Sequence, residues 1–167
     1  KEWDYYYISN KEYALCLTIA DMGYVGALSI SVIDFVTPAQ FTNSSIFFFP
    51  MGKLKMPSDS SVGSCIYHKK GRLDMTFTLS PGKRHIKCDF KKFDGNKDLY
   101  VDITLEQPPM DTMVIATPWK ENPKCFYYNQ KINCMRASGT VVYGGKKYTF
   151  NPETDFGTLD WGRGVWT

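Results

Sequence analysis

Leu99-Tyr100-Val101-Asp102-Ile103-Thr104-Leu105-Glu106 alternates larger apolar side chains with more polar ones at every step. Because successive side chains of a strand point to opposite faces, this order places one face in a core and the other in water. The same alternation recurs in residues 13–20 and 72–79. One-sided strands of this kind are typical of antiparallel sheets, whereas parallel strands read as continuous apolar runs. The sequence therefore predicts an antiparallel sheet with one apolar face.

Turn-forming residues recur at short, even spacing between these runs, for example Lys70-Gly71, Ser80-Pro81-Gly82 and Gly144-Gly145. Such spacing predicts a meander of about nine or ten strands. Only residues 151–155, with a capping Asn and a following Pro, indicate a single helical turn. A sheet with one apolar face and no helices over it must curl closed or pack on a second layer. We therefore expect an all-β, up-and-down meander that closes into a barrel, with a sandwich as the second possibility.

The composition indicates one ordinary globular domain over residues 1–167, with 43% hydrophobic and 22% charged residues. The aromatic share of 16% favours strands and is also typical of pockets for apolar ligands. A net charge of +3 is too small to indicate a nucleic-acid partner. No apolar run approaches the roughly 20 residues of a membrane span, so the chain is not expected to be transmembrane.

Five cysteines, an odd number, are scattered along the chain and predict free thiols in a cytoplasmic protein. Cys125 and Cys134 flank a hairpin expected at Asn129-Gln130, so a disulfide between them is the alternative for an oxidising compartment. Two further cysteines and the two histidines stand in C-x-x-H-like spacing, namely Cys65 with His68 and His85 with Cys88. Residues three apart on a strand point to opposite faces, so we expect no metal site. No Walker or dinucleotide-binding glycine pattern occurs either, so we expect no cofactor.

The end of the chain, residues 157–167, interleaves a carboxylate, a guanidinium and two indoles with three glycines. Asp160 and Arg163 are expected to pair or to present their charges to a ligand, with Trp161 and Trp166 as apolar walls. Trp3, near the other end of the chain, is likewise a candidate either for binding a ligand or for a structural role. The candidate ligand-binding residues are therefore Trp3, Trp161, Arg163 and Trp166. The alternative is structural, with Arg163 packed across the end of the barrel and stacked on indole rings.

Two carboxylates are weak candidates for acid catalysis, Asp160 and Asp34. Asp34 precedes Phe35 at the end of a strand-like run, and an inward carboxylate there would have a raised pKa suited to proton transfer. The alternative places Asp34 outward on the strand. No nucleophile elbow and no dinucleotide-binding glycine pattern occurs in the sequence.

Three segments carry a family resemblance: residues 1–6, residues 18–24 and Leu159-Asp160-Trp161-Gly162-Arg163-Gly164-Val165-Trp166. They resemble a large family of uncharacterised proteins, known as a domain of unknown function, whose full-length members are about twice as long as this chain. The resemblance implies that residues 1–167 are the N-terminal half of a longer protein, as does the aromatic end of the chain. More distantly, the meander is similar to the two-barrel lipocalin-like proteins, which include carotenoid hydratases and tocopherol cyclase.

This distant similarity implies a lipocalin-like barrel and leaves three functional hypotheses. The first is a barrel that binds a lipophilic small molecule among its aromatic side chains. The second is half of an enzyme of the hydratase, cyclase or isomerase kind, which acts on an apolar substrate by acid catalysis. The third is a purely structural half that serves the C-terminal half of the same protein.

Overall fold

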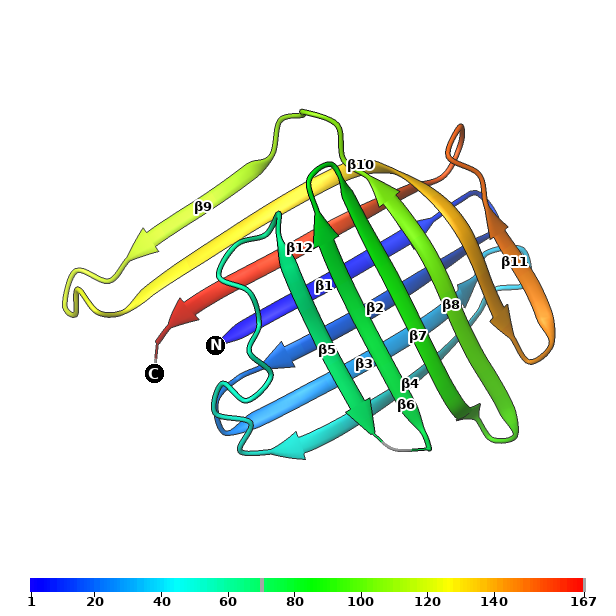
Figure 1. Cartoon of the computed structure of the whole chain (residues 1–167), viewed down its shortest axis with the longest axis horizontal. Helices are drawn as coiled ribbons and strands as arrows, with labels where there is room; N and C mark the ends of the chain where they lie inside the picture. The colour runs from blue at the N-terminus through cyan, green and yellow to red at the C-terminus, as the bar shows by residue number, and fades with distance from the viewer. Residues whose placement is uncertain (70, 167) are drawn as a thin grey trace.

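One antiparallel β-sheet makes up the fold of residues 1–69 and 71–166, which this computed structural model describes (Figure 1). The side chains of residues 68 and 69 lie outside the description. Every strand pair in these ranges is antiparallel, so the prediction of an all-β antiparallel fold is confirmed. The strands are β1 (Glu2–Ser9), β2 (Tyr13–Asp21), β3 (Val25–Asp34), β4 (Ala39–Phe48), β5 (Gly63–Lys69), β6 (Leu73–Ser80), β7 (Lys83–Asp94), β8 (Lys97–Glu106), β9 (Met113–Pro118), β10 (Phe126–Tyr143), β11 (Lys146–Phe150) and β12 (Phe156–Val165).

The helical turn expected at residues 151–155 is present as a hydrogen-bonded turn between β11 and β12. The amides of Thr154 and Asp155 both donate to the Asn151 carbonyl, at 3.0 and 2.8 Å. The Glu153 amide donates to Asn151 Oδ1 at 3.1 Å, as at a helix cap. The residues that the structure describes form no helix other than this single turn. They accordingly include no helix that is long and apolar enough to cross a membrane.

The strands follow an up-and-down order, as predicted. Along the sheet they run β4-β3-β2-β1-β12-β10-β8-β7-β6-β5, with each strand hydrogen-bonded to its neighbours in this order. The first and last strands of the chain, β1 and β12, lie side by side over the whole length of β1. The two remaining strands, β9 and β11, both pair with β10. Strand β10 therefore has partners at both of its ends.

The long strand β10 is the corner of the sheet. Its first part pairs with β12 and β9, and its second part pairs with β8 and β11. The register shifts between Ile132 and Met135, and Cys134 adopts a positive φ of 60°. Because such bulges bend a strand and increase its twist, the sheet changes direction here. The strands β5–β8 consequently cross over β1–β4 (Figure 1).

The core lies between these two parts of the folded sheet. Tyr6 of β1 meets Phe77 of β6 edge to face, with ring centroids 4.9 Å apart, and both side chains are fully buried. Further aromatic pairs join β4 to the opposite part, Phe41 with Phe93 at 5.1 Å and Phe47 with Tyr67 at 5.3 Å. The hydrogen-bonded path through the described strands ends at β4 and β5. The sheet is thus curled around an apolar core, and its closure into a barrel stays a prediction.

The prediction of a hairpin at Asn129-Gln130 is wrong, because β10 runs through both residues without a break. Asn129 is fully buried, and its amide donates to Asp160 Oδ1 and to the Trp161 carbonyl, both at 2.7 Å. These two polar residues, which are typical of a turn, therefore lie in the middle of a strand. Cys125 and Cys134 lie along one extended segment, too far apart for a disulfide, and both are free.

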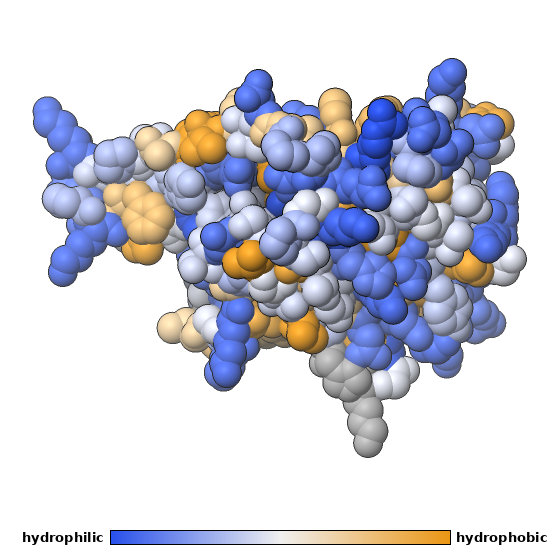
Figure 2. All heavy atoms as spheres, turned by 45° about the horizontal axis from the view of Figure 1, so that its top comes forward, coloured by the Kyte–Doolittle hydropathy of each residue, from blue (hydrophilic) through white to orange (hydrophobic). Residues whose placement is uncertain are grey.

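The start of β10 and its partner β9 form an arm that projects from the body (Figures 1 and 2). Every residue of β9 is exposed, and the apolar Met113, Val114 and Ile115 stand on it with exposed fractions of 49%, 50% and 36%. Figure 2 shows apolar and polar side chains mixed along this arm. The opposite end of β10, beside β11, returns to the body of the sheet.

Candidate functional site

Strand β12 sends alternate side chains to opposite faces of the sheet and thereby divides the predicted site. Trp161 and Arg163 face the interior and are 2% and 7% exposed. Gly162 and Gly164 alternate with them and face outward. Because Gly162 pairs with Trp3 of β1, that indole lies on the outer face. The four candidate ligand-binding residues therefore form two groups, with Trp161 and Arg163 inside and Trp3 and Trp166 outside.

The outer group covers the two glycines. A Cβ atom at Gly162 would lie 2.1 Å from Cζ2 of Trp3, and one at Gly164 would lie 2.2 Å from Cζ3 of Trp166. The two indoles meet edge to face at 6.2 Å, and Tyr127 packs against both. Two ring systems therefore occupy the space that side chains at positions 162 and 164 would take. This is the physical reason for the alternating glycines of the terminal motif.

Asp160 belongs to the same outer face, where it is a hydrogen-bond acceptor. Trp3 Nε1 and Asn129 Nδ2 donate to its Oδ1 at 3.1 and 2.7 Å, and Lys131 Nζ pairs with its Oδ2. Burial raises the pKa of Asp160, but the hydrogen bonds from Lys131, Asn129 and Trp3 outweigh it and hold the pKa below its ordinary value. A carboxylate held ionised in this way is a poor proton donor at neutral pH.

Arg163 ties three segments together inside the sheet. Its Nη2 lies 2.9 Å from Asp4 Oδ1 on β1, in an ion pair whose side chains are 8% and 1% exposed. Its Nε and Nη2 also donate to the Pro57 carbonyl, and its Nη1 donates to the carbonyls of Trp3 and Gly162. The guanidinium stacks on Trp161, 4.3 Å from the ring centroid. Every nitrogen of the guanidinium is therefore engaged by the protein itself. This arrangement corresponds to the structural alternative, in which Arg163 packs across the end of the sheet and stacks on an indole ring.

A cavity of about 570 Å³ opens beside Arg163, between the start of β1, the end of β12, the start of β10 and the loop after β4. Tyr128 packs edge to face on Trp161 at 5.5 Å and forms one wall. The indole Nε1 of Trp161 is buried and has no hydrogen-bond partner among the described residues. The other side chains that line the cavity include Glu2, Asp21, Met51, Phe126 and Val165.

Glu2 is a carboxylic acid of this cavity that sequence reasoning missed. It lies opposite Arg163 in the β1–β12 register and is half-buried. Burial raises the pKa of Glu2 above its ordinary value, and this effect outweighs the attraction of the nearby Arg163 charge. The signal was present in the sequence, because Glu2, Asp4 and Tyr6 are two apart and therefore share the inner face. Asp21, also on this wall, is occupied by the amides of Gly23 and Gly52, both at 2.8 Å.

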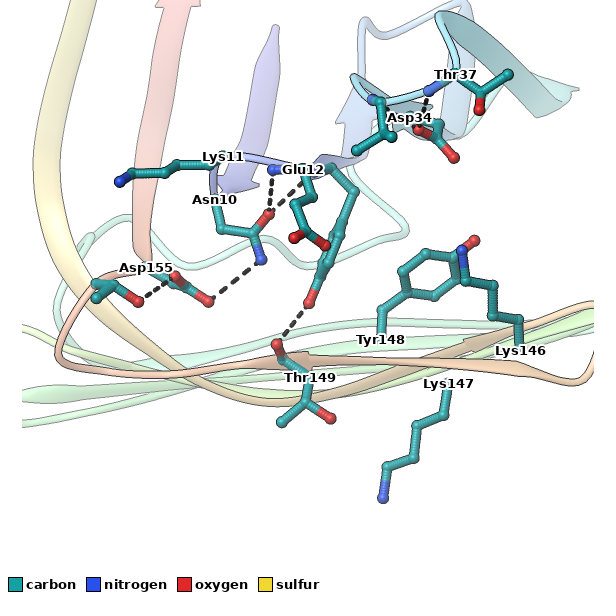
Figure 3. A pocket seen from close by; sticks show the side chains of 13 residues that line it. Asn10, Lys11, Glu12, Asp34, Thr37, Lys146, Lys147, Tyr148, Thr149 and Asp155 are labelled. Atoms are coloured by element: carbon teal, nitrogen blue, oxygen red, sulfur yellow. Dashed lines mark hydrogen bonds between the residues drawn. The ribbon is translucent and has the colours of Figure 1, made fainter.

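A second hollow, of about 710 Å³, lies at the opposite end of the strands and contains Asp34 (Figure 3). Asp34 Oδ1 accepts hydrogen bonds from the amides of Val36 and Thr37, at 2.9 and 2.8 Å, and so shapes the turn after β3. Asp155 on the other wall accepts from the Asn151 amide at 2.8 Å and from Asn10 Nδ2 at 3.4 Å. The polar groups here serve the turns themselves. Asp34 and Asp160 are not brought together.

The residues with zinc-like spacing have separate partners. Cys65 is buried, and its thiol donates to Asp4 Oδ2 at 3.3 Å. His85 Nε2 lies 2.7 Å from Asp102 Oδ1 on the neighbouring strand. The side chain of His68 lies outside the described residues. Within the part of the chain that is described, no group of three or more His, Cys, Asp or Glu side chains is placed to hold a metal ion.

The fold is similar to that of two solved hydratase-type and AttH-type proteins, each about twice as long as this chain. A candidate AttH protein from Nitrosomonas europaea matches with a TM-score of 0.59 and 10% identity, over 96% of this chain and 50% of that one. Kievitone hydratase from Nectria haematococca matches with a TM-score of 0.55 and 13% identity, over 99% of this chain and 48% of that one. At such identities the likeness is one of fold alone.

The chain belongs to the family described as domain of unknown function DUF2804, whose model matches residues 1–167. The resemblance that the terminal motif carries is therefore confirmed. No curated protein matches the chain in a sequence comparison. The chain spans about half the length of the solved structures that share its fold.

The buried ion pair predicts that removal of Arg163 destabilises the protein much more than removal of an exposed arginine. Arg163→Ala leaves Asp4 buried without its cation, so we expect a loss of about 3–5 kcal/mol in the free energy of unfolding. Arg136 is the matched control, because its contact with Glu153 is 3.9 Å long and exposed. Arg136→Ala should cost less than about 1 kcal/mol. Urea unfolding of both variants checks this, and equal losses would contradict the structural role of Arg163.

The packing of Trp3 on Gly162 predicts a strong coupling between the two residues. Gly162→Ala places a methyl group inside the volume of the indole, so we expect it to destabilise the protein by about 1–3 kcal/mol. In a Trp3→Ala background the same change should cost much less, because the ring is gone. A double-mutant cycle by urea unfolding measures the coupling, and additive effects would show that the ring does not set the need for glycine.

The raised pKa of Glu2 predicts a pH-dependent effect of Glu2→Gln. The folded protein disfavours the ionised Glu2 carboxylate. At pH values above the raised pKa of the folded state, this lowers the free energy of unfolding of the wild type. Below the ordinary pKa of 4.5 the carboxyl group is protonated in both states and the loss disappears. Glu2→Gln should therefore stabilise the protein at neutral pH, and the gain should shrink as the pH falls through the folded pKa. Urea unfolding across this pH range, with ¹³C titration of the Glu2 carboxyl, measures it. If the stability gained by Glu2→Gln instead grew as the pH falls, the pKa of Glu2 would be lowered and not raised in the folded protein.

Proposed function

We propose that this chain is a lipocalin-like half of a two-barrel protein and that it binds a lipophilic small molecule in the cavity beside Trp161. The single observation that carries the proposal is this cavity of about 570 Å³, bordered by Phe126, Tyr128 and Trp161. Its size is within the roughly 300–1,000 Å³ of small-molecule sites, which are mostly apolar with a few polar groups. The unpartnered indole N–H of Trp161 supports the same reading, because such buried donors are rare in folded proteins.

The four candidate ligand-binding residues take different roles in this proposal. Trp161 is a wall of the site, and Arg163 fixes that wall through its stacking and its bond to Asp4. Trp3 and Trp166 support the same strand from the outer face, where they cover Gly162 and Gly164. They hold the shape of the site without facing its ligand.

A second candidate function is acid catalysis on an apolar substrate in the same cavity. The observation that favours it is Glu2, which lies on the cavity wall with a pKa raised by burial. A carboxyl group of this kind keeps its proton to higher pH and is suited to protonate a substrate. Asp160 and Asp34 are weaker candidates, because each already accepts hydrogen bonds from the protein.

We further propose a cytoplasmic location, which the five free cysteines support. The curled sheet, in which one aromatic pair joins β4 to β5 and another joins β4 to β7, supports the barrel that the lipocalin-like proposal requires. The partner in this proposal is a second half of the same protein. The solved structures of similar fold, each about twice as long, support it.

Two phenylalanines with the same exposed fraction, 39%, test the ligand site. Phe126 borders the cavity, whereas Phe156 lies at the other end of β12, away from it. We expect Phe126→Ala to weaken binding of the neutral fluorescent probe N-phenyl-1-naphthylamine about tenfold, because it removes apolar contact area. Phe156→Ala should leave the affinity unchanged. Fluorescence titration measures both, and equal affinities of all three proteins would leave the structural half as the better description.

A further inference from the structure

Large apolar side chains stand exposed at the end of the sheet where the candidate cavity opens. Phe48, at the end of β4, is 75% exposed, and Phe49 directly after it is 65% exposed. Tyr24 in the β2–β3 turn and Met51 in the following loop are 67% and 68% exposed. Val165 at the end of β12 is 52% exposed and completes the set. We call these five residues the apolar rim.

The backbone holds the rim in place. The Phe49 amide donates to the Tyr24 carbonyl at 2.8 Å, and the Met51 amide donates to the Gly23 carbonyl at 3.0 Å. Phe49 and Met51 both adopt left-handed backbone conformations, with φ of 55° and 49°. Such conformations are unfavourable for bulky residues and persist only where the surrounding structure fixes them. The exposed side chains are therefore displayed by a defined turn and not by a loose segment.

The rim is continuous with the candidate cavity. Met51 and Val165 line the cavity itself. Together with Tyr24 and Trp166 they also line a neighbouring hollow of about 450 Å³. A body seated on the rim would thus cover both openings.

We infer that the apolar rim is the docking surface for a second β-barrel half of the same polypeptide, which closes the mouth of the cavity. The inference rests on the two-half part of the proposed function. Its support is that the AttH-type structure and kievitone hydratase are each about twice as long as this chain, which covers 50% and 48% of them. Contiguous exposed apolar side chains at one end of a soluble fold are typical of interaction sites.

The charges around the rim favour a protein surface over an anionic membrane. Lys53 and Lys55 are exposed in the loop and Lys1 borders the opening, but the carboxylates of Glu2 and Asp21 border it as well. Surfaces that bind anionic lipids carry clusters of about four to eight basic residues without such acids. An apolar centre within a mixed rim of both signs is the usual anatomy of a protein interface.

Hydroxyl-radical footprinting of the full-length protein that contains this chain tests the inference. Phe35, which is 43% exposed in the turn after β3 at the opposite end of the strands, is the internal reference. If the rim is covered, Phe48, Phe49 and Met51 should be modified at least about fivefold more slowly, relative to Phe35, than their exposed fractions imply. Modification in proportion to exposure would overturn the docking surface.

Two other occupants are distinguished in the same experiment. Protection that appears only with added vesicles of phosphatidylcholine and phosphatidylserine would assign the rim to a lipid surface and overturn the inference. Protection that rises with protein concentration would assign it to a second copy, with the same consequence. All these measurements are made without ligand, so their outcome is independent of the probe titration at Phe126.

A pair of variants in the full-length protein adds a second readout. Phe48→Lys places a charge in the docking surface and should restore fast modification of Phe49 and Met51. Val36→Lys changes a residue of similar exposure, 72%, in the distant β3–β4 turn and should leave the rim protected. Protection that survives Phe48→Lys would contradict docking at the rim. If Phe48→Lys does not fold, the wild-type footprint decides.

Discussion

The covering of one apolar sheet face by the same sheet is the constraint on which this structure depends. The described residues form no helix that could cover it, so strands β5–β8 must lie across β1–β4. The bend of β10 between Ile132 and Met135 makes this possible, since one strand then serves both parts of the sheet. Gly139 lies just beyond, with a φ of 124°, and a Cβ there would come 2.2 Å from the Asp102 carbonyl oxygen. The corner thus needs both an irregular register and a residue without a side chain.

The terminal motif solves a second problem, namely how β1 and β12 are held together at their open end. Its glycines receive the indoles of Trp3 and Trp166 on the outer face, while its Arg163 bonds to Asp4 on the inner face. Each face therefore fixes the same register by a different interaction, one by ring packing and one by a buried ion pair. A buried pair is weak evidence of net stability, but a slip of either strand by one residue would separate these two charges and leave both buried without a partner.

The sequence was sufficient for the fold class because period-two alternation is a local property of each strand. The same period, applied to residues 161–164, also separates Trp161 and Arg163 from the outward glycines. What it does not give is the partner strand, so the placement of Trp3 on Gly162 depends on the β1–β12 pairing. Asn129 was misread as a turn because its buried hydrogen bonds to Asp160 and Trp161 are not visible in a local pattern. Period two also places Glu2 on the inner face with Asp4 and Tyr6, but the burial that raises its pKa depends on the β1–β12 pairing and on the loop after β4, which a local pattern does not give.

The charges at the open end favour an uncharged ligand. Three acids, Glu2, Asp4 and Asp21, lie on the inner side of this end, and the cations beside them are Arg163 and Lys1 at the start of the chain. The Arg163 guanidinium bonds directly to Asp4, and Asp21 is satisfied by two backbone amides. Glu2 is left with burial as the dominant influence, which raises its pKa. A ligand with an anionic group beside Glu2 would meet like charge in a partly desolvated place, whereas a neutral hydroxyl or carbonyl would meet a hydrogen-bonding partner. The electrostatics of the cavity therefore match the apolar character of its walls.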